Sequence, residues 1–341
     1  MAFSDLLHKV MRREDLTAEE ALSAMDDIVE GRARQAQVAG LLAGLAMKGE
    51  RPAEIVGFAR GMRDRAVRLP TAPPDCVDLC GTGGDNSGSF NISSAAAVVV
   101  AACGVPVAKH GNRAVSSHCG SADVFEALGV DIAAPPPVVA SCLHEAGIAF
   151  LFAPTFHPSM RRVAEARREL GIRTAFNLLG PLTNPAAPRC QLVGVPRPEF
   201  TELIARALAL LGSERAWVVH GADGLDEIST TGYTKVSECR AGKVNTFYLH
   251  PADVGLPKAL RNELAGGDAA DNAQIIQDVF AGTPGPARDI VVLNAGAVLF
   301  LSGRAEGLRD GLAIAAGAID AGAARATLAR LVRYSRPGGG S

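Results

Sequence analysis

A glycine-rich loop is the first segment of the sequence whose residues are suited to binding an anion. Gly81-Thr82-Gly83-Gly84-Asp85 follows a predicted strand over residues 76–80. Glycines let backbone amides turn towards a phosphate because no side chain blocks the approach. The segment has neither the Gly-Lys-Ser/Thr ending of a P-loop nor the spacing of GxGxxG. A plain structural turn is the alternative, and the spacing alone leaves both interpretations open.

The next polar residues, Asn91-Ile92-Ser93-Ser94, open a predicted helix that runs to Cys103. An amide, two hydroxyls and the free N–H groups of a helix N-terminus converge there, which suits a phosphate. Ser93 is equally consistent with a plain helix N-cap.

A second polar loop, Lys109 to Ser117, follows a predicted strand over residues 105–108. It supplies two cations and several hydroxyls, which together satisfy the charge and the oxygens of a phosphate. Two of the residues here have plain alternatives: His110 as a hydrogen-bonded loop histidine, and Ser121 as the cap of the helix predicted over residues 122–128.

Two adjacent carboxylates, Asp226 and Glu227, come shortly after a predicted strand that ends at His220. Mg²⁺ keeps several waters and takes one or two carboxylates together with substrate phosphates, so this pair suits it. A solvated acidic turn is the alternative.

Four arginines at positions 161, 162, 167 and 168 form a further cationic group. They fit a solvated helix face, and one of them could equally clamp a substrate carboxylate, for which the guanidinium fork is suited.

The elements that position these residues fall into two groups. Residues 4 to about 68 read as consecutive helices, with a capping box at Thr17-Ala18-Glu19-Glu20 and apolar stripes that include Leu41, Leu42 and Leu45. A proline-rich hinge over residues 69–74 follows. Beyond it, short apolar strands alternate with helices, which predicts α/β architecture with a mostly parallel sheet flanked by helices.

We therefore expect a small helical domain over residues 1–72 and a larger α/β domain over residues 73–341. The charged, then loop-like, stretch within 161–190 could rejoin the helical domain. That domain is either one lobe of a single core or a dimerisation unit.

Composition limits the class of protein. The 341 residues carry 34 Lys and Arg against 36 Asp and Glu, which disfavours a nucleic-acid role. The seven cysteines form no CxxC pair, which is typical of reduced thiols in a cytosolic protein. No signal peptide is visible, and the longest apolar run is too short to span a bilayer.

Taken together, the polar segments resemble the anthranilate phosphoribosyltransferase family, within the larger group of nucleoside phosphorylases and phosphoribosyltransferases. The similar segments follow the family order along nearly the whole chain: GTGGD (81–85), FNISS (90–94), KHGNRAVSS (109–117), GSADVFEALGV (120–130), HPSM (157–160), RRELGIRTAFNLLGPLTNPA (167–186), QLVGV (191–195) and HGADGLDEIS (220–229). The resemblance implies a helical lobe and an α/β lobe. It also implies an Mg²⁺-dependent cytoplasmic homodimer of tryptophan biosynthesis that transfers phosphoribose from 5-phosphoribosyl 1-diphosphate to the amine of anthranilate.

The resemblance assigns roles residue by residue. The residues implied to hold 5-phosphoribosyl 1-diphosphate are Gly81, Gly84, Asp85, Ser89, Asn91, Ile92, Ser93, Ser94, Lys109, His110, Gly111, Asn112, Arg113, Ala114, Val115, Ser116, Ser117 and Ser121. Those implied to hold anthranilate are Gly81, Asn112, Arg167, His110, His157, Gly180 and Pro181. Ser93, Asp226 and Glu227 would engage Mg²⁺, as two ions with the substrate bound.

The sequence departs from the family pattern at a few positions. Asn86 stands where Gly is usual, Ser89 and Ser94 where Thr is usual, His118-Cys119 where Lys-Ser is usual, and Glu165-Ala166 where Pro-Val is usual. Serine keeps the hydroxyl of threonine, so binding should survive, whereas His118 removes a cation and is expected to weaken affinity. The alternatives are a pyrimidine nucleoside phosphorylase, which lacks the segments over 109–113 and 177–185, and a non-catalytic nucleic-acid-binding paralogue.

Overall fold

The computed structural model describes residues 2–69, 71–114 and 118–336. The predicted site residues Val115, Ser116 and Ser117, and Pro70 of the predicted hinge, lie outside the described residues. All seven cysteines are free thiols, as the sequence predicts.

A seven-stranded sheet forms the centre of the larger unit, in the order β3-β2-β1-β4-β5-β6-β7. The first five strands in that order are parallel, and β6 and β7 are antiparallel additions at one edge. The mostly parallel sheet is therefore confirmed. The strands are β1 (Val77–Gly81), β2 (Val107–Gly111), β3 (Ile148–Phe152), β4 (Cys190–Gly194), β5 (Arg215–Gly221), β6 (Thr234–Arg240) and β7 (Lys243–Leu249).

The second strand differs from the one expected over residues 105–108. It begins at Val107, where pairing with β3 starts, and continues to Gly111 opposite Phe152. Pro106 has no N–H to donate to a ladder, so regular pairing starts after it. Lys109 and His110 consequently lie within β2 and not in the loop that follows it.

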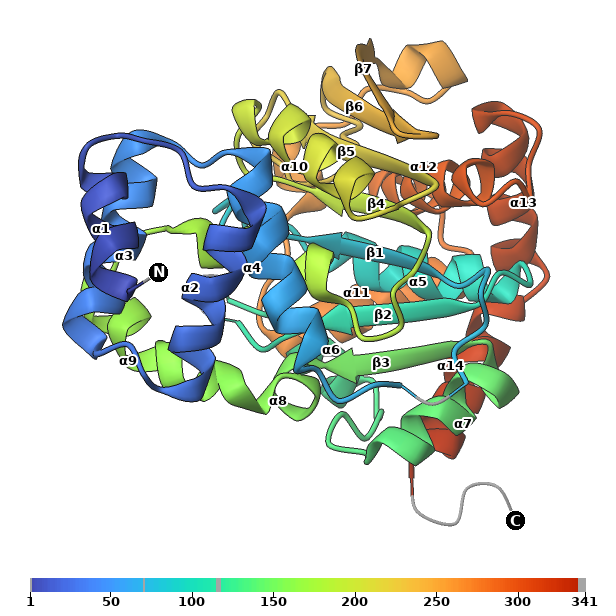
Figure 1. Ribbon diagram of the computed structural model, residues 1–341. Coiled ribbons are helices and arrows are strands. Elements are labelled where there is room, and N and C mark those ends of the chain that lie inside the picture. Colours follow the sequence, from blue (N-terminus) through green and yellow to red (C-terminus); the bar gives the residue numbers. More distant parts are fainter. Residues whose placement is uncertain (1, 70, 115–117, 337–341) are drawn as a thin grey trace.

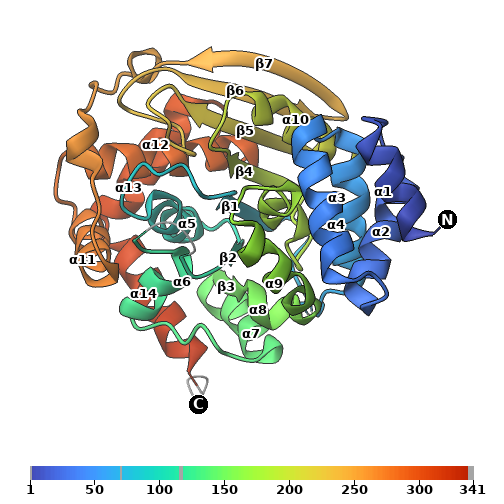
Figure 2. The ribbon, with the colours of Figure 1, turned by 90° about the vertical axis from the view of Figure 1, so that its left-hand side faces the viewer.

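Helices flank the sheet on both faces (Figures 1 and 2). In chain order they are α5 (Ile92–Ala102), α6 (Ser121–Ala127), α7 (Pro136–Ala146), α8 (Ala153–Phe156), α10 (Glu199–Leu210), α11 (Ala269–Phe280), α12 (Pro286–Leu301), α13 (Leu308–Asp320) and α14 (Ala323–Ser335). Short 3₁₀ turns span Pro158–Met160, Ala175–Asn177, Gly180–Thr183, Pro251–Val254 and Arg261–Leu264.

The small unit is a bundle of α1 (Phe3–Met11), α2 (Ala18–Glu30), α3 (Gln35–Lys48) and α4 (Pro52–Asp64). The predicted capping box is confirmed: the Glu20 N–H donates to Thr17 Oγ1 (3.2 Å), and the Thr17 N–H donates to a Glu20 carboxylate oxygen (2.8 Å). Gly31 ends α2 in the left-handed conformation. Leu41, Leu42 and Leu45 are fully buried, so they form the interior of the bundle and not its surface.

Two apolar cores meet at the sheet, because successive side chains of a strand point to opposite faces. In β5, Trp217 and Val219 belong to the core shared with α5 and α12, whereas Ala216 and Val218 belong to the core shared with the bundle and α10. The second core also contains Val163 of α9 (Arg161–Leu170). This part of residues 161–190 therefore packs on the bundle.

The bundle stands at the end of the sheet towards which β3 points in Figure 1. Among the described residues, no single helix is long and apolar enough to cross a membrane, and α13 and α14 meet that length only as a pair bent by 69°.

Candidate active site

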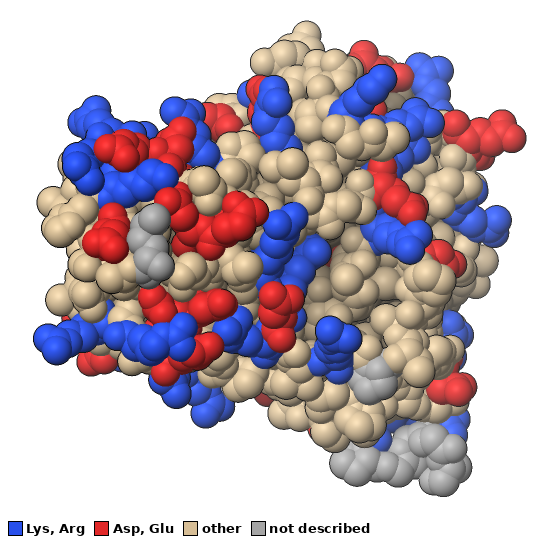
Figure 3. Space-filling view, in the orientation of Figure 1, with Lys and Arg blue, Asp and Glu red and all other residues tan. Residues whose placement is uncertain are grey.

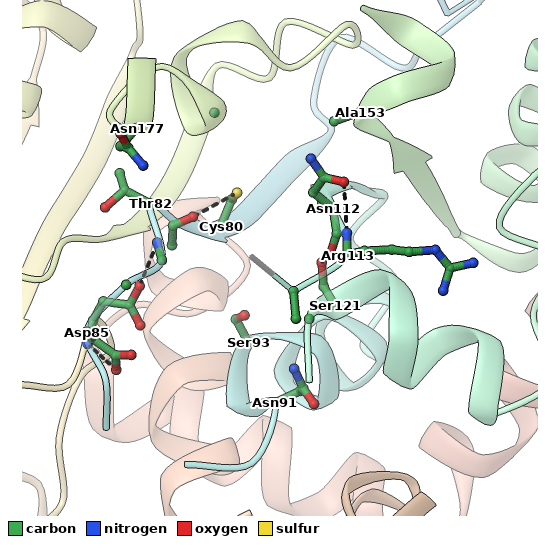
Figure 4. Close-up of a pocket in the computed structure, with 18 of the residues that line it drawn as sticks. Cys80, Thr82, Asp85, Asn91, Ser93, Asn112, Arg113, Ser121, Ala153 and Asn177 are labelled. Carbon is green, nitrogen blue, oxygen red and sulfur yellow. Dashed lines mark hydrogen bonds between the residues drawn. The ribbon is translucent and has the colours of Figure 1, made fainter. Parts of the chain in front are cut away.

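The strand order places a cavity where parallel α/β sheets hold their ligands. β1 lies between β2 and β4, so the connections leave its carboxyl end in opposite directions, and such a switch point opens a crevice. A cavity of about 740 Å³ lies there, which is large enough for two small substrates. Figure 4 shows Thr82 and Asp85 on one side of it, Asn112 and Ser121 on the other, and Asn91 and Ser93 between them.

The loop after β1 is folded against the acidic pair. The Gly83 N–H donates to Asp226 Oδ2 (3.1 Å), and the Asp226 N–H donates to Asp85 Oδ2 (3.4 Å). A Cβ at Gly81 would fall on Asp226 Oδ2. Glycine is therefore required there by the close approach of the carboxylate, and at Gly84 by a φ of +74°.

The N-terminus of α5 opens directly onto the same carboxylates. The N-cap is Asn91, so the interpretation of Ser93 as a plain cap is wrong. Ser93 lies in the first turn, and its N–H donates to Glu227 Oε1 (3.1 Å). The partial positive charge of this helix end faces the cavity, which favours a bound anion.

Asn91 and Ser121 are positioned by the neighbouring loops. Asn91 Nδ2 donates to the Cys119 carbonyl (3.2 Å), and Asn272 Nδ2 donates to Asn91 Oδ1 (2.9 Å). Ser121 is the first residue of α6, whose N-cap is Gly120, so the alternative interpretation of Ser121 as a plain helix cap is also wrong. Its hydroxyl donates to the Asn112 carbonyl (3.4 Å).

The two cations of the second polar segment behave differently from each other. Lys109 is buried in β2, and its ammonium donates to the Leu79 carbonyl and to Ser93 Oγ (3.4 Å). Arg113 points away from the cavity (Figure 4) and pairs with Asp123 (2.9 Å) and Glu126 (2.8 Å) on α6. Arg113 nevertheless belongs to the lining of the cavity, so its expected role at the phosphate stays a prediction, although its guanidinium is paired with α6 in this structure.

Burial raises the pKa values of both acidic residues. The pKa of Asp226 is raised by desolvation and by the neighbouring charge of Asp85, and that of Glu227 by desolvation and by Asp226. Two adjacent carboxylates, one buried and one half-buried, repel each other, and a divalent cation would relieve that repulsion. Within the described chain, no three His, Cys, Asp or Glu side chains form a metal cluster. The oxygen donors present fit Mg²⁺, which fills its remaining positions with water and substrate phosphate.

A pair of histidines lines the cavity on the side of the bundle. The rings of His110 and His157 lie 5.3 Å apart, edge to face, and His110 Nδ1 contacts the Gly180 carbonyl (2.9 Å). Burial lowers the pKa of His110 to about 3 and that of His157 to about 4, so both rings are neutral at pH 7. Gly180 lines the cavity as expected. The expectation that Pro181 lines the cavity is wrong. Pro181 is buried outside the lining, and its carbonyl accepts a hydrogen bond from Gln191 Nε2 (2.8 Å).

The four arginines of α9 separate by helical position. Arg167 is half-buried and lines the cavity together with Arg161, one face of the helix being turned to it. Arg168 is exposed and does not reach the lining, and Arg162 Nη1 donates to the Glu30 carbonyl (2.8 Å). Burial lowers the pKa of Arg167, and the nearby charge of Arg173 lowers it further.

Arg173 is a site residue that the sequence patterns did not single out, and Thr82, Asn177 and Asn272 are others that line the cavity. Arg173 lies inside the family segment over residues 167–186, but that motif by itself does not say which of its basic residues face the cavity. Buried polar atoms without a hydrogen-bond partner in the described chain gather on this lining: Thr82 Oγ1, Ser94 Oγ, His110 Nε2, His157 Nε2, and Nε and Nη2 of Arg173. A polar ligand is what such a lining fits.

Of the remaining residues that the sequence predicts for the site, most reach the cavity. The lining contains Gly81, Gly84, Asp85, Ser89, Asn91, Ile92, Ser93, Ser94, Lys109, His110, Gly111, Asn112, Ala114, Ser121, Asp226 and Glu227. They come from segments up to 146 positions apart in the chain (81 to 227), and the sheet brings them together.

Comparison with known proteins agrees with this architecture. The chain matches the helical bundle domain of a glycosyl transferase family over residues 4–66 and the α/β domain of the same family over residues 73–325. It is 55% identical over 328 residues to the anthranilate phosphoribosyltransferase of Moorella thermoacetica, which covers 96% of this chain and 97% of that protein.

Solved structures give the same result. The anthranilate phosphoribosyltransferase of Thermus thermophilus matches with a TM-score of 0.93 at 45% identity, over 98% of this chain and 100% of that one. The Saccharomyces cerevisiae enzyme in complex with PRPP and Mg matches with a TM-score of 0.89 at 27% identity, over 98% and 97%. Its complex with 4-fluoroanthranilate matches with a TM-score of 0.86 at 26% identity, over 98% of both chains. The expected helical lobe and α/β lobe are confirmed, and the chain belongs to the anthranilate phosphoribosyltransferase family.

Proposed function

We propose that this protein transfers the phosphoribosyl group of 5-phosphoribosyl 1-diphosphate to the amine of anthranilate, giving N-(5-phosphoribosyl)anthranilate and pyrophosphate in tryptophan biosynthesis. The observation that carries the proposal is one cavity that holds an anion-binding loop and helix end, a buried acidic pair and a half-buried arginine. These match, in turn, a phosphorylated sugar, the metal that accompanies a diphosphate, and a carboxylate.

The reaction breaks the bond from C1 of the ribose to the diphosphate oxygen, and the electron pair leaves with the diphosphate. C1 becomes cation-like, and the neutral aryl amine attacks it and afterwards loses a proton to water. No protein nucleophile is needed, so catalysis rests on holding the two substrates in line and on stabilising the departing charge. The glycine loop over residues 81–85 and the positive end of the α5 dipole line the part of the cavity where that charge would be held.

Asp226 and Glu227, with the Ser93 hydroxyl beside them, would hold Mg²⁺. When bound, the ion neutralises charge on the diphosphate and so favours its departure. Lys109 would help to position the Ser93 hydroxyl, because its buried ammonium donates to Ser93 Oγ (3.4 Å).

Anthranilate would lie on the side of α9. The Arg167 guanidinium would donate two parallel hydrogen bonds to the carboxylate. His110 and His157 supply neutral ring surfaces, Gly180 leaves room for a flat ring, and Asn112 lies between the two substrates.

A fluorescence assay tests the proposal directly. Anthranilate fluorescence should fall on addition of 5-phosphoribosyl 1-diphosphate and Mg²⁺, and chromatography should recover pyrophosphate and the phosphoribosylated amine in equal amounts. Unchanged anthranilate over long incubation at high enzyme concentration would reject the function.

We also propose that the protein is a cytoplasmic homodimer in which residues 1–72 contribute to the interface and residues 73–341 bind the sugar substrate. Free thiols at all seven cysteines favour a reducing compartment. On the face shown in Figure 3, acidic and basic side chains are interspersed, which does not favour a nucleic-acid partner.

A further inference from the structure

Arg173 occupies a distinctive place in the cavity. It follows Gly171, the left-handed residue that ends α9, and thus comes from the segment that packs on the helical bundle. Its guanidinium nevertheless lies on the glycine loop after β1, because a Cβ at Gly84 would fall on Arg173 Nη1 and lie 3.0 Å from its Cζ. The glycine is what allows a planar cation to rest against the loop backbone.

The donors of Arg173 are poised for a ligand. Nε and Nη2 are buried and donate to no partner in the described part of the chain, and the residue lines the cavity. A buried guanidinium without hydrogen bonds is costly, so its donors require an acceptor with several oxygens. Burial lowers the pKa of Arg173, and the charges of Asp226 and Asp85 act in the opposite direction.

Two anionic groups enter this cavity under the proposed function: the diphosphate and the anthranilate carboxylate. The charges around Arg173 distinguish them. The charges of Asp226 and Asp85 attract Arg173, which rests against Gly84, whereas the cations Arg197 and Arg167 repel it. Asp226 would hold the metal, and a diphosphate chelates Mg²⁺ far better than a single carboxylate does, so the diphosphate belongs on the side of Asp226 and Gly84.

We propose that Arg173 donates hydrogen bonds to the diphosphate of 5-phosphoribosyl 1-diphosphate, and thus stabilises the leaving group together with the metal. This inference rests on the proposed function. As the bond from C1 to oxygen breaks, the electron pair stays on the diphosphate, and Arg173 stabilises that charge without transferring a proton. The planar fork matters here, because a lysine offers a point charge and cannot make paired hydrogen bonds.

The test compares Arg173→Gln and Arg173→Lys with the wild type. Arg168→Gln is the matched control, because Arg168 is exposed on the adjacent α9 and lies outside the cavity lining. Calorimetric titration with pyrophosphate in excess Mg²⁺ measures leaving-group binding without any turnover. We expect Arg173→Gln to weaken pyrophosphate binding by about tenfold or more, as loss of a charged hydrogen bond does. Arg173→Lys should be intermediate, and Arg168→Gln should equal the wild type.

Steady-state kinetics supply the second readout. Arg173→Gln should lower kcat and raise KM for 5-phosphoribosyl 1-diphosphate, with KM for anthranilate within about twofold of the wild type. Wild-type pyrophosphate affinity in the variant overturns the inference, as does a rise confined to KM for anthranilate, which would assign Arg173 to the carboxylate. If Arg173→Gln does not fold, Arg173→Lys decides by the same two criteria. A wild-type protein that neither binds pyrophosphate nor consumes anthranilate overturns the proposed function itself, which separates the two failures.

Discussion

The acidic pair Asp226 and Glu227 combines burial with adjacency, and each of these features raises the free energy of a charged carboxylate. Glu227 is buried and Asp226 is half-buried, and they are adjacent, so the charge of Asp226 adds to the effect of burial in raising the pKa of Glu227. Backbone N–H groups of Gly83 and Ser93 hold one oxygen of each in place. A bound cation would offset the repulsion between the two carboxylates. The metal assignment therefore rests on these two residues.

Replacing both carboxylates by amides tests that assignment. Asp226→Asn with Glu227→Gln keeps the side-chain shape but removes the charges, so turnover should fall on the order of 100-fold or more while the protein stays folded. Circular dichroism and Mg²⁺-dependent fluorescence assays measure the two properties. Glu145→Gln, at an exposed position of α7, is the control. Near-normal activity of the double variant would contradict the assignment.

Arg167 and Arg173 divide two anions between them, and this predicts opposite kinetic signatures. Arg167→Ala should weaken the use of anthranilate by about 1.5–3 kcal/mol, the range for a charged hydrogen bond, and leave binding of 5-phosphoribosyl 1-diphosphate unchanged. Separate titration of each substrate measures this, with the exposed Arg168→Ala as control. If the affinity for the sugar substrate collapses instead, Arg167 belongs to the phosphate side of the cavity.

At the scale of elements, the carboxyl ends of β1 and β4 must leave room for the loop that follows β5. The Thr82 N–H donates to the Gly194 carbonyl (2.9 Å), which ties the start of the glycine loop to the end of β4. Gly194 is the last residue of that strand and lies against the backbone of Asp226. The ends of the neighbouring strands β1 and β4 therefore determine the position of the acidic pair.

Gly194→Ala should displace the acidic pair. The added Cβ would fall on the Asp226 carbonyl, which is backbone and cannot rotate away. We expect a loss of about 1–3 kcal/mol in unfolding free energy together with weaker Mg²⁺ dependence. Urea unfolding and the fluorescence assay check both.

The matched control is Gly317→Ala in the last turn of α13, where a Cβ meets nothing within 4 Å. Alanine should stabilise that helix by about 0.5–1 kcal/mol. Equal behaviour of the two variants would mean that the close approach at Gly194 is unimportant.

At the scale of the whole molecule, burial of histidine next to the cavity couples stability to pH. Burial lowers the pKa of His157 to about 4, whereas an unfolded chain has a histidine pKa near 6.5. Between these values the unfolded state binds a proton that the folded state does not. The free energy of unfolding should therefore be fully retained above about pH 6.5 and fall as the pH drops towards 4.

His157→Gln should reduce that loss. Urea unfolding at pH 7.5 and pH 5 should show a smaller decrease in unfolding free energy for the variant than for the wild type. His8→Gln, at an exposed position of α1, should behave as the wild type. An identical decrease in His157→Gln and the wild type would show that another group carries the acid sensitivity.

The proposed dimer also belongs to this scale. Leu41, Leu42 and Leu45 are interior, so the apolar surface of the bundle must come from other residues, and Met11 and Met47 are 70% and 79% exposed. Met11→Asp with Met47→Asp should shift the sedimentation mass from dimer to monomer at micromolar concentration, with Tyr248→Asp on β7 as control. A monomeric wild type, or an unaffected dimer in the double variant, would place the interface elsewhere or remove it.

Much of this protein could be predicted from local sequence. The capping box at Thr17, the strand that precedes the glycine loop, the adjacent Asp226 and Glu227 and the family resemblance all depend on residues within a few positions of one another. Hydrogen bonds of a helix turn, apolar periodicity and motif spacing are local properties, so a sequence expresses them directly. The alternation of helices and strands likewise predicted the mostly parallel sheet.

Other features were decided only by the tertiary structure. Arg173 joins the site because the turn after α9 lays it on Gly84, which is distant in the chain. Arg113 also lines the cavity, but its guanidinium pairs with Asp123 and Glu126 on α6. Ser93 is not the cap of α5, Pro181 is not in the lining, and the bundle leucines are interior. Which side chain faces a cavity depends on contacts between segments distant in sequence. Spacing along the chain carries no information on those contacts until the strands have been ordered in the sheet.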